Sequence, residues 1–189
     1  MARYRAGIAT RSRIIAATRE VLAEAGLEGT TIKAICQRAA IRPGSFYNLF
    51  ESKDEVILTV IREAVEAVDP DPEGGGDDTV AELVEAYITF VTGQPTLARI
   101  YLQIAVTGGV TDTHLHGRVV RHGERRRERF AAALLRARFD LDRAAAIREA
   151  EKMLATLNGL ALFRILDDGF DFTGHARDLV RRVEHAGLQ

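Results

Sequence analysis

The sequence predicts an all-α protein of about nine helices, with an N-terminal helix-turn-helix domain of three helices and a C-terminal helical domain. Apolar residues recur at helical spacing along most of the 189 residues, and we find no segment with the alternation of a β-strand. Residues 30–50 contain two short helical patterns separated by a turn. A stretch rich in Pro and Gly, residues 70–76, separates this basic part of the chain from a longer acidic part.

The first helix is expected from Ile14 to Ala25, where apolar side chains repeat at helical spacing and Gly26 follows as a C-cap. Residues 1–13 carry four arginines and little apolar content, which indicates a mobile arm. Such an arm either contacts a polyanion or is simply solvated.

The second and third helices form the helix-turn-helix. Ile32, Ile35, Cys36 and Ala39 lie at the spacing of one buried helical face, and Thr30 or Thr31 supplies the N-cap hydroxyl. Proline disfavours a helical conformation in the residue before it but suits the first turn of a helix. A new helix of about two turns is therefore expected from Pro43 or Gly44.

This third helix is apolar on one side and polar on the other. Phe46, Leu49 and Phe50 are available for packing, whereas Ser45, Tyr47 and Asn48 can point outward. A helix this short gains little stability from its own hydrogen bonds, so its neighbours must hold it in place. Because the major groove of DNA admits a helix and is read by its side chains, the polar side is a candidate DNA-reading surface.

Charge is unevenly distributed along the chain. Residues 1–53 contain nine Lys or Arg against four Asp or Glu, although the whole chain has a net charge of -1. A basic N-terminal part on an acidic remainder indicates a polyanion partner for the first part only.

The run AAIRPGSFYNLFESKDEVI resembles the signature of TetR-type bacterial transcriptional repressors, and the resemblance covers roughly the first 65 residues. Three positions depart from the commonest pattern: Ala40 replaces a turn glycine, Pro43 a frequent lysine, and Leu49 a frequent His or Tyr. A left-handed Ala40 would cost about 1–2 kcal/mol. The matching positions are Gly44, Ser45, Phe46, Tyr47, Phe50, Ser52, Lys53 and Asp54.

The resemblance implies a homodimer that binds a palindromic double-stranded DNA operator and is released by a small-molecule effector. Lys53 is expected to contact the DNA backbone, Arg42 either a guanine edge or a phosphate, and Tyr47 a phosphate unless it packs inside the domain. The predicted DNA-binding residues are Thr31, Arg42, Pro43, Gly44, Ser45, Tyr47, Asn48 and Lys53.

The remaining chain is helical in period. Ser52 should cap a fourth helix reaching about Val68, and Asp142 a long helix reaching about Leu166. Further helices are expected from Val80 over three turns, from Thr96 to Thr107 with Gly108-Gly109 as its end, from Thr113 to Phe139, and from a cap at Thr173. We therefore predict a helix-turn-helix domain over 1–53, a connecting helix over 54–70, a loop over 71–79, and an effector-binding and dimerisation domain over 80–189.

The helix ending near Leu166 is apolar around its whole circumference, so it needs burial on two sides. It is either wholly internal or shared between its own core and a second copy, which is where TetR-type repressors dimerise through a four-helix bundle. The predicted interface residues are Leu154, Leu157, Ala161, Leu162, Ile165, Leu179 and Val183. The predicted effector-pocket residues are Tyr87, Phe90, Tyr101, Ile104, Phe130 and Phe163, although such apolar stripes also form plain core.

Other constellations are weaker. His114, His116 and His122 do not have the helical spacing of metal ligands, so we predict no metal site. The arginines between 121 and 129 form either a solvated face or a site for an anionic effector. Cys36, the only cysteine, reads as a small buried hydrophobe, with a redox sensor as the alternative.

We find no nucleophile motif and no cofactor fingerprint, so we expect neither catalysis nor a cofactor. The absence of a long apolar run and of a secretion signal predicts a cytoplasmic protein without membrane contact. Two alternatives remain: a constitutive DNA-binding dimer without effector, and a helical interaction or catalytic module that does not bind DNA.

Overall fold

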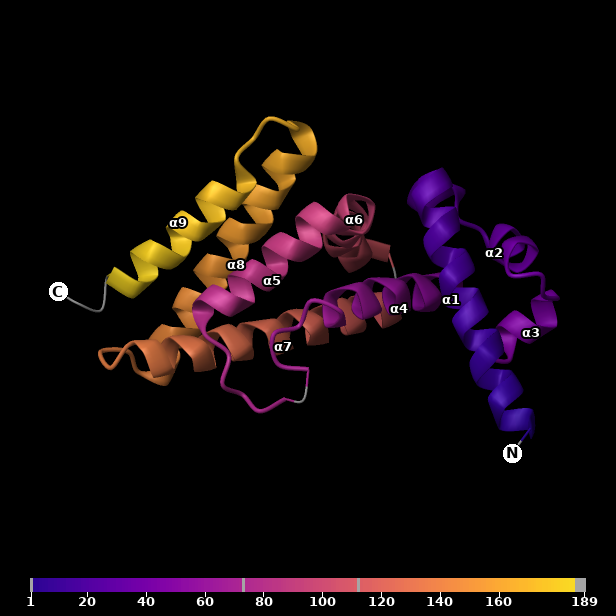
Figure 1. The fold of residues 1–189 in the computed structure, drawn as a ribbon, viewed down its shortest axis with the longest axis horizontal. Coiled ribbons are helices and arrows are strands. Elements are labelled where there is room, and N and C mark those ends of the chain that lie inside the picture. The colour runs from indigo at the N-terminus through magenta and orange to yellow at the C-terminus, as the bar shows by residue number, and fades with distance from the viewer. Residues whose placement is uncertain (1, 73, 112, 186–189) are drawn as a thin grey trace. The chain divides into compact units, whose positions relative to one another are not determined.

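A computed structural model of the chain describes residues 2–72, 74–111 and 113–185, and all regular secondary structure in this part is helical, in nine helices (Figure 1). The predicted all-α fold is therefore confirmed. The chain divides into two compact units, Met1–Ala64 and Val65–Gln189.

Unit 1 contains α1 (Ala2–Gly29), α2 (Ile32–Arg38), α3 (Pro43–Tyr47) and most of α4 (Lys53–Glu66). Apolar side chains from all four helices form its core, with Ile14, Leu22, Ile35, Phe46 and Ile57 fully buried. The predicted stripe of α1 and the two short helices of the helix-turn-helix are therefore present.

The first helix is longer than predicted. It begins at Ala2, so the interpretation of residues 1–13 as an arm is wrong for the described residues 2–13. Arg11 explains part of this, because its guanidinium lies 5.4 Å from the centre of the Phe50 ring and 3.7 Å from the Glu63 carboxylate. The predicted end at Gly26 corresponds to a kink inside α1, where Gly26 has a non-helical backbone with φ of 66° and ψ of -171°, and a short helical piece follows to Gly29.

Side-chain caps hold the start of α2. The Thr31 hydroxyl accepts a hydrogen bond from the Ala34 amide at 3.1 Å, which makes Thr31 the N-cap. The Thr30 hydroxyl instead donates to the Gly26 carbonyl at 2.6 Å. The two adjacent threonines thus satisfy two different backbone groups at this corner.

Ala40 occupies the turn between α2 and α3 with φ of 51°, the one non-glycine residue with positive φ in the described chain. The conformation that the missing turn glycine would adopt is therefore kept by an alanine, at a cost of about 1–2 kcal/mol. The helix that follows was expected to have about two turns but is shorter. It ends at Tyr47, and residues 48 and 49 form a turn.

Unit 2 contains α5 (Val80–Gly93), α6 (Pro95–Thr111), α7 (Thr113–Ala137), α8 (Arg143–Leu166) and α9 (Phe172–His185). Helix α7 packs against α8 and α6, and α9 lies beside α5 and α8 (Figure 1). Asp142 caps α8 as predicted, with its carboxylate accepting from the Ala145 amide at 2.7 Å. The apolar residues between these helices form one core, which includes Val84, Leu134, Met153, Leu157 and Phe172.

Three predicted helix boundaries in unit 2 are wrong. Helix α7 ends at Ala137 and not at Phe139. Helix α6 continues through Gly108-Gly109 to Thr111, since a cost of about 1 kcal/mol per glycine does not by itself end a helix. Helix α9 begins one residue before Thr173, and its first turn is capped by Asp171, whose carboxylate accepts from the Gly174 amide at 2.9 Å.

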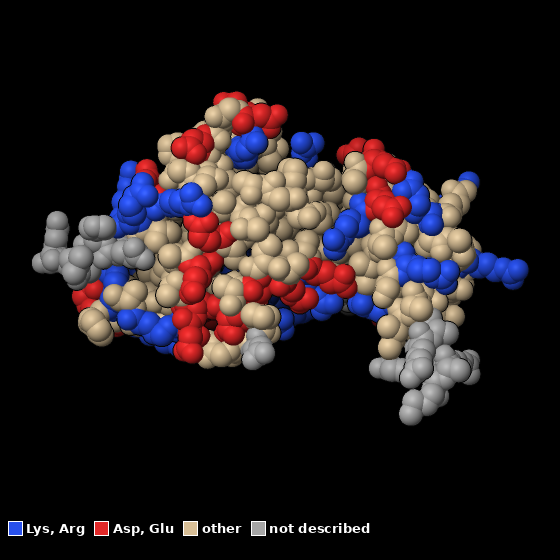
Figure 2. Space-filling model, in the orientation of Figure 1, with Lys and Arg blue, Asp and Glu red and all other residues tan. Residues whose placement is uncertain are grey.

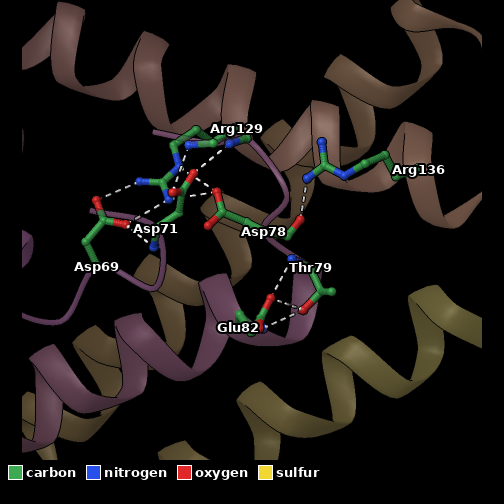
Figure 3. A network of polar contacts seen from close by, with 9 residues as sticks. Asp69, Asp71, Asp78, Thr79, Glu82, Arg129 and Arg136 are labelled. Carbon is green, nitrogen blue, oxygen red and sulfur yellow. Dashed lines mark hydrogen bonds and ion pairs between the residues drawn. The ribbon is translucent and has the colours of Figure 1, made fainter. Parts of the chain in front are cut away.

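The connection between α4 and α5, residues 67–79, is held by ionic contacts. The Arg129 guanidinium of α7 lies between the carboxylates of Asp69 and Asp78 (Figure 3). Arg136 donates to the Asp78 carbonyl, and Thr79 and Glu82 form a capping box at the start of α5. Acidic side chains gather over this connection in Figure 2.

The unit boundary falls inside α4, since Lys53 to Ala64 belong to unit 1 and Val65 and Glu66 to unit 2. The functional division over 1–53, 54–70, 71–79 and 80–189 remains a prediction. Among the described residues, no helix combines the length and the apolar character that crossing a membrane requires.

Candidate functional site

Helix α3 is short and is anchored from one side. Arg42 is its extended N-cap, with φ of -84° and ψ of 151°, and Pro43 occupies the first turn. Phe46 is fully buried, its ring centre 5.8 Å from that of Phe50 and 5.6 Å from that of Tyr47. The two phenylalanines therefore hold a helix that its own hydrogen bonds could not stabilise.

The eight predicted DNA-binding residues all lie in unit 1, and we call them the α3 surface. Tyr47 is 58% exposed, so its ring is not part of the core. Ser45 and Lys53 are half-buried. The other exposed members are Thr31, Arg42, Pro43, Gly44 and Asn48.

The positive charges of unit 1 differ in what surrounds them. Arg38 is paired with Glu20 at 2.9 Å and with Glu24 at 2.5 Å, and hydrogen bonding to Arg38 lowers the pKa of Glu24. In contrast, Lys33, Arg42 and Lys53 make no ion pair with any described residue. Their charges are available to an external anion. Lys33 was missed by the sequence reasoning, although its place in the first turn of α2 beside Thr31 is visible in the sequence.

Cys36 lies in α2 and is buried. Burial raises the pKa of its thiol, which keeps the thiol protonated and unreactive. The structure thus places Cys36 among the core residues of unit 1, as the simpler interpretation expected.

Unit 2 contains a cavity of about 70 Å³, large enough for a few waters or a small organic molecule. Its wall is mainly apolar and aromatic, and Asp69, His122, Arg126 and Arg129 add carboxylate, imidazole and guanidinium groups. The lining residues are Val65, Val68, Asp69, Pro70, Leu83, Ala86, Tyr87, Phe90, Tyr101, His122, Arg126, Arg129 and Phe130.

Four of the six predicted pocket residues, Tyr87, Phe90, Tyr101 and Phe130, line this cavity. Ile104 is buried but is not part of the wall. Phe163 is 58% exposed on α8, where its ring lies 5.6 Å from that of Phe170. Phe163 does not line the cavity, because it lies on the outward face of its helix.

The polar part of the wall includes Arg126 and Arg129, which the sequence reasoning offered as a solvated face or an anion site without connecting them to the predicted pocket. Arg126 donates from Nη1 to the Tyr101 hydroxyl at 3.1 Å, and its guanidinium carbon lies 4.7 Å from the centre of the Tyr87 ring. Burial, and then the nearby charges of Arg126 and Arg125, lower the pKa of His122 to about 4. His122 is therefore neutral at pH 7.

One signal in the sequence could have identified this wall. His122, Arg126, Arg129 and Phe130 stand at i, i+4, i+7 and i+8, the spacing of one helical face. Arg129 is engaged, since it contacts Asp69 and Asp78 at 2.7 to 2.9 Å. Hydrogen bonding to Arg129 also lowers the pKa of Asp69.

The predicted dimer-interface residues fall into two groups. Leu162 is 50% exposed, and Leu154, Ile165 and Leu179 are half-buried. The remaining three, Leu157, Ala161 and Val183, are buried within the unit itself. Phe163 and Leu166, neither of them predicted for the interface, extend the exposed apolar face of α8.

Among the described residues, no group of three or more His, Cys, Asp or Glu side chains is arranged to hold a metal ion. The side chains of His114 and His116 lie outside the described part of the structure. His122 contacts Tyr101, with ring centres 5.9 Å apart.

Comparison with known proteins identifies the N-terminal part of the chain. Residues 14–60 match the family model described as bacterial regulatory proteins, tetR family. The HTH-type transcriptional regulator UidR of Escherichia coli K12 is 44% identical over 52 residues, which are 28% of this chain. The match spans 26% of UidR, about a quarter of that protein's length.

Solved structures match nearly the whole chain. The transcriptional regulator FadR from Bacillus subtilis, in complex with stearoyl-CoA, has a TM-score of 0.69 at 15% identity, over 91% of this chain and 96% of FadR. SmeT, the repressor of the Stenotrophomonas maltophilia multidrug efflux pump SmeDEF, has a TM-score of 0.68 at 21% identity, over 93% and 89%. Residues 14–60 therefore match the tetR family of bacterial regulatory proteins, and over nearly its whole length the chain has the fold of solved transcriptional regulators.

Proposed function

We propose that this protein is a cytoplasmic transcriptional repressor that binds a palindromic double-stranded DNA operator as a homodimer and is released by a small-molecule effector. The α3 surface carries the proposal. It presents Tyr47 and Asn48 on a helix anchored by buried phenylalanines, with the cations Arg42 and Lys53 close by in sequence.

DNA recognition by this surface follows from its chemistry. A major groove accepts a helix, and exposed polar side chains on the helix can reach base edges. Phosphate contacts fix the position of a protein on the duplex, and an unpaired lysine such as Lys53 is suited to them. We assign base reading to Arg42, Ser45 and Asn48, and backbone contact to Thr31, Tyr47 and Lys53.

Dimerisation is assigned to the exposed apolar face of α8. Leu162, Phe163 and Leu166 leave half or more of their surface in water in the single chain. Large exposed apolar side chains on one helical face are typical of a protein interface. Helix α9, which packs against α8, contributes Leu179 at the border of this face.

Effector binding is assigned to the cavity of unit 2. FadR has been solved with stearoyl-CoA and SmeT with triclosan, so small molecules bind to proteins of this fold. Helix α4 runs from Lys53 of the α3 surface to Val65 of the cavity wall and Glu66. A ligand that binds two conformations of this helix with different affinity shifts their populations, and DNA affinity falls accordingly.

Retention of the full chain on duplex DNA across a salt series tests the proposal. Binding that weakens steeply between about 50 and 200 mM salt is expected from phosphate neutralisation. A chain that is never retained, even at low salt, would support the helical module without DNA contact. A chain that is retained but responds to no compound would support the constitutive dimer.

A further inference from the structure

The cavity of unit 2 has one cation that the described protein leaves without a counter-charge. Arg126 lines the cavity and is half-buried, yet no carboxylate of a described residue lies within ion-pair distance of it. Its described polar partner is the neutral Tyr101 hydroxyl, and the ring of Tyr87 lies against its guanidinium. Burying part of a charge without a paired anion is unfavourable, so the site favours an anion that arrives from outside.

The neighbouring charges are arranged differently. Arg129 lies between Asp69 and Asp78 and makes hydrogen bonds from Nε, Nη1 and Nη2, so its charge is more than balanced (Figure 3). Asp69 is the one acidic residue among the lining residues, and its two carboxylate oxygens are both engaged by Arg129. Among the described residues, the wall thus keeps one uncompensated charge, the positive charge of Arg126.

Tyr101 provides a second donor at the same point. Its hydroxyl oxygen accepts from Arg126, so the hydroxyl proton is left for another acceptor. His122 contacts the Tyr101 ring and is neutral at pH 7, because burial and the charges of Arg126 and Arg125 disfavour its protonated form. A cationic ligand head would meet the same repulsion.

The remainder of the wall is apolar. Leu83, Phe90 and Phe130 are buried side chains that offer aliphatic and aromatic surface to a ligand body. A volume of about 70 Å³ has room for a small apolar group. Apolar pockets with a few converging polar groups are typical of small-molecule sites.

We propose that the cavity binds a small organic acid, with its anionic oxygens on Arg126 and the Tyr101 hydroxyl and its apolar body against Leu83, Phe90 and Phe130. This assignment rests on the proposed effector role of the cavity and names the chemical class of the effector. Arg126 fixes the sign of the ligand charge, whereas the apolar wall contacts the body of the ligand.

Calorimetric titration of the full chain at pH 7.5 tests the charge assignment with three ligands that share a benzene ring and differ in charge. Sodium benzoate is the acid, benzamide the neutral analogue and benzylammonium the cation, with hexanoate and 1-naphthoate as acids of other shapes. At least one acid should bind, and the neutral and cationic analogues should bind at least tenfold more weakly than benzoate. Equal or tighter binding of benzamide or benzylammonium, or binding by none of the acids, would overturn the proposal.

Variants on α7 test the residue. Arg126→Gln should weaken acid binding about tenfold to a hundredfold, because hydrogen bonds to a charged group are lost. Arg121→Gln, at an exposed α7 residue that does not line the cavity, is the matched control and should leave the affinity unchanged. Tyr101→Phe should give a smaller loss. Unchanged acid binding in Arg126→Gln would contradict the assignment, and if that variant does not fold, the charge series on the original chain still decides.

DNA retention measured in parallel separates this inference from the function on which it rests. An acid that binds the cavity but leaves DNA retention unchanged would keep the ligand assignment and remove the effector role. A chain that holds DNA but binds no acid would keep the DNA-binding function and remove the ligand assignment.

Discussion

Ala40 is a single residue at which the backbone of the helix-turn-helix is strained. Its φ of 51° is a conformation that glycine adopts without cost, whereas a Cβ atom makes it unfavourable by about 1–2 kcal/mol. A glycine would remove this strain but would give the unfolded chain more freedom, which offsets about 0.4–1 kcal/mol.

Ala40→Gly should therefore raise the free energy of unfolding by about 0.5–1 kcal/mol. Urea unfolding of both chains would measure the difference. Ala23→Gly is the matched control, because Ala23 is exposed inside α1 and a glycine there should destabilise by about 0.5–1 kcal/mol. If the two variants are destabilised alike, Ala40 is not strained.

His122 should make the stability of unit 2 depend on pH. Its folded pKa of about 4 lies below the value of 6.5 in the unfolded chain, so the unfolded state takes up the proton first as the pH falls. The stability that neutral His122 contributes is therefore complete above about pH 6.5 and is lost towards pH 4. The total is at most about 3 kcal/mol.

His122→Gln should remove this component. Urea unfolding at pH 7, 5.5 and 4.5 should show that the original chain loses more stability than the variant over this range. The carboxylates titrate in both chains, so their contributions to the pH dependence cancel in the difference. Parallel pH curves for the two chains would show that His122 does not carry the effect.

Arg42 and Lys53 should affect DNA binding in different ways. Lys53→Ala should weaken binding to all sequences alike and flatten the salt dependence by about one unit, as expected for a phosphate contact. Arg42→Ala should cost about 1–3 kcal/mol and relax the preference at one position per half-site, if this residue reaches a guanine edge.

Affinities for operator and scrambled DNA across a salt series would separate these effects. Lys152→Ala is the control, since Lys152 is an exposed lysine of α8 that is paired with Glu149. A uniform loss from Arg42→Ala would reduce its role to backbone contact, and normal binding by both variants would contradict their assignment to the α3 surface.

At the residue scale, the sequence could place a side chain when its contacts lie a few positions away along the chain. Thr31, Pro43 and Phe46 act through neighbours a few positions away, so the sequence was sufficient to place them. Arg126 and His122 act through residues of other helices. Their shared helical face was visible, but nothing in the sequence showed which helix lay opposite.

At the scale of an element, helix α8 carries the proposed dimer interface. It was predicted to need burial on two sides, and the structure buries one of them, with Leu157 fully buried and Leu162 half exposed. The two leucines stand on different faces and so should respond differently to a charge, although the sequence alone treated them as equivalent.

Leu162→Glu should give folded monomers, because its charge would remain in water in the single chain but would be buried unpaired in a dimer. Leu157→Glu should instead unfold unit 2, because the core offers the charge neither water nor a partner. Analytical ultracentrifugation with circular dichroism would distinguish the outcomes. A folded dimer of Leu162→Glu would place the interface elsewhere.

Helix boundaries were less predictable than helix existence. The sequence identified Asp142 as the cap of α8. It suggested Thr173 for α9, whose first turn is instead capped by Asp171. Helix α6 continues through two glycines, because intrinsic propensity is a weak determinant that the tertiary structure overrides.

At the scale of the whole molecule, the chain joins a basic domain to an acidic one through α4. The asymmetry of charge and the motif over 30–50 predicted that the N-terminal part binds DNA, and the family model of bacterial regulatory proteins matches residues 14–60. The similarity to UidR covers only this part, and the remainder shares its fold with FadR and SmeT at low identity.

Selection of bound duplexes from a pool of random DNA, using the full chain, tests the central claim most directly. We expect enrichment of an inverted repeat, with two half-sites that a twofold dimer contacts equally. The Arg42→Ala chain should relax one position in each half-site of that repeat. Recovery of a pool that stays random, or of a single unrepeated half-site, would contradict a dimer that reads DNA through the α3 surface.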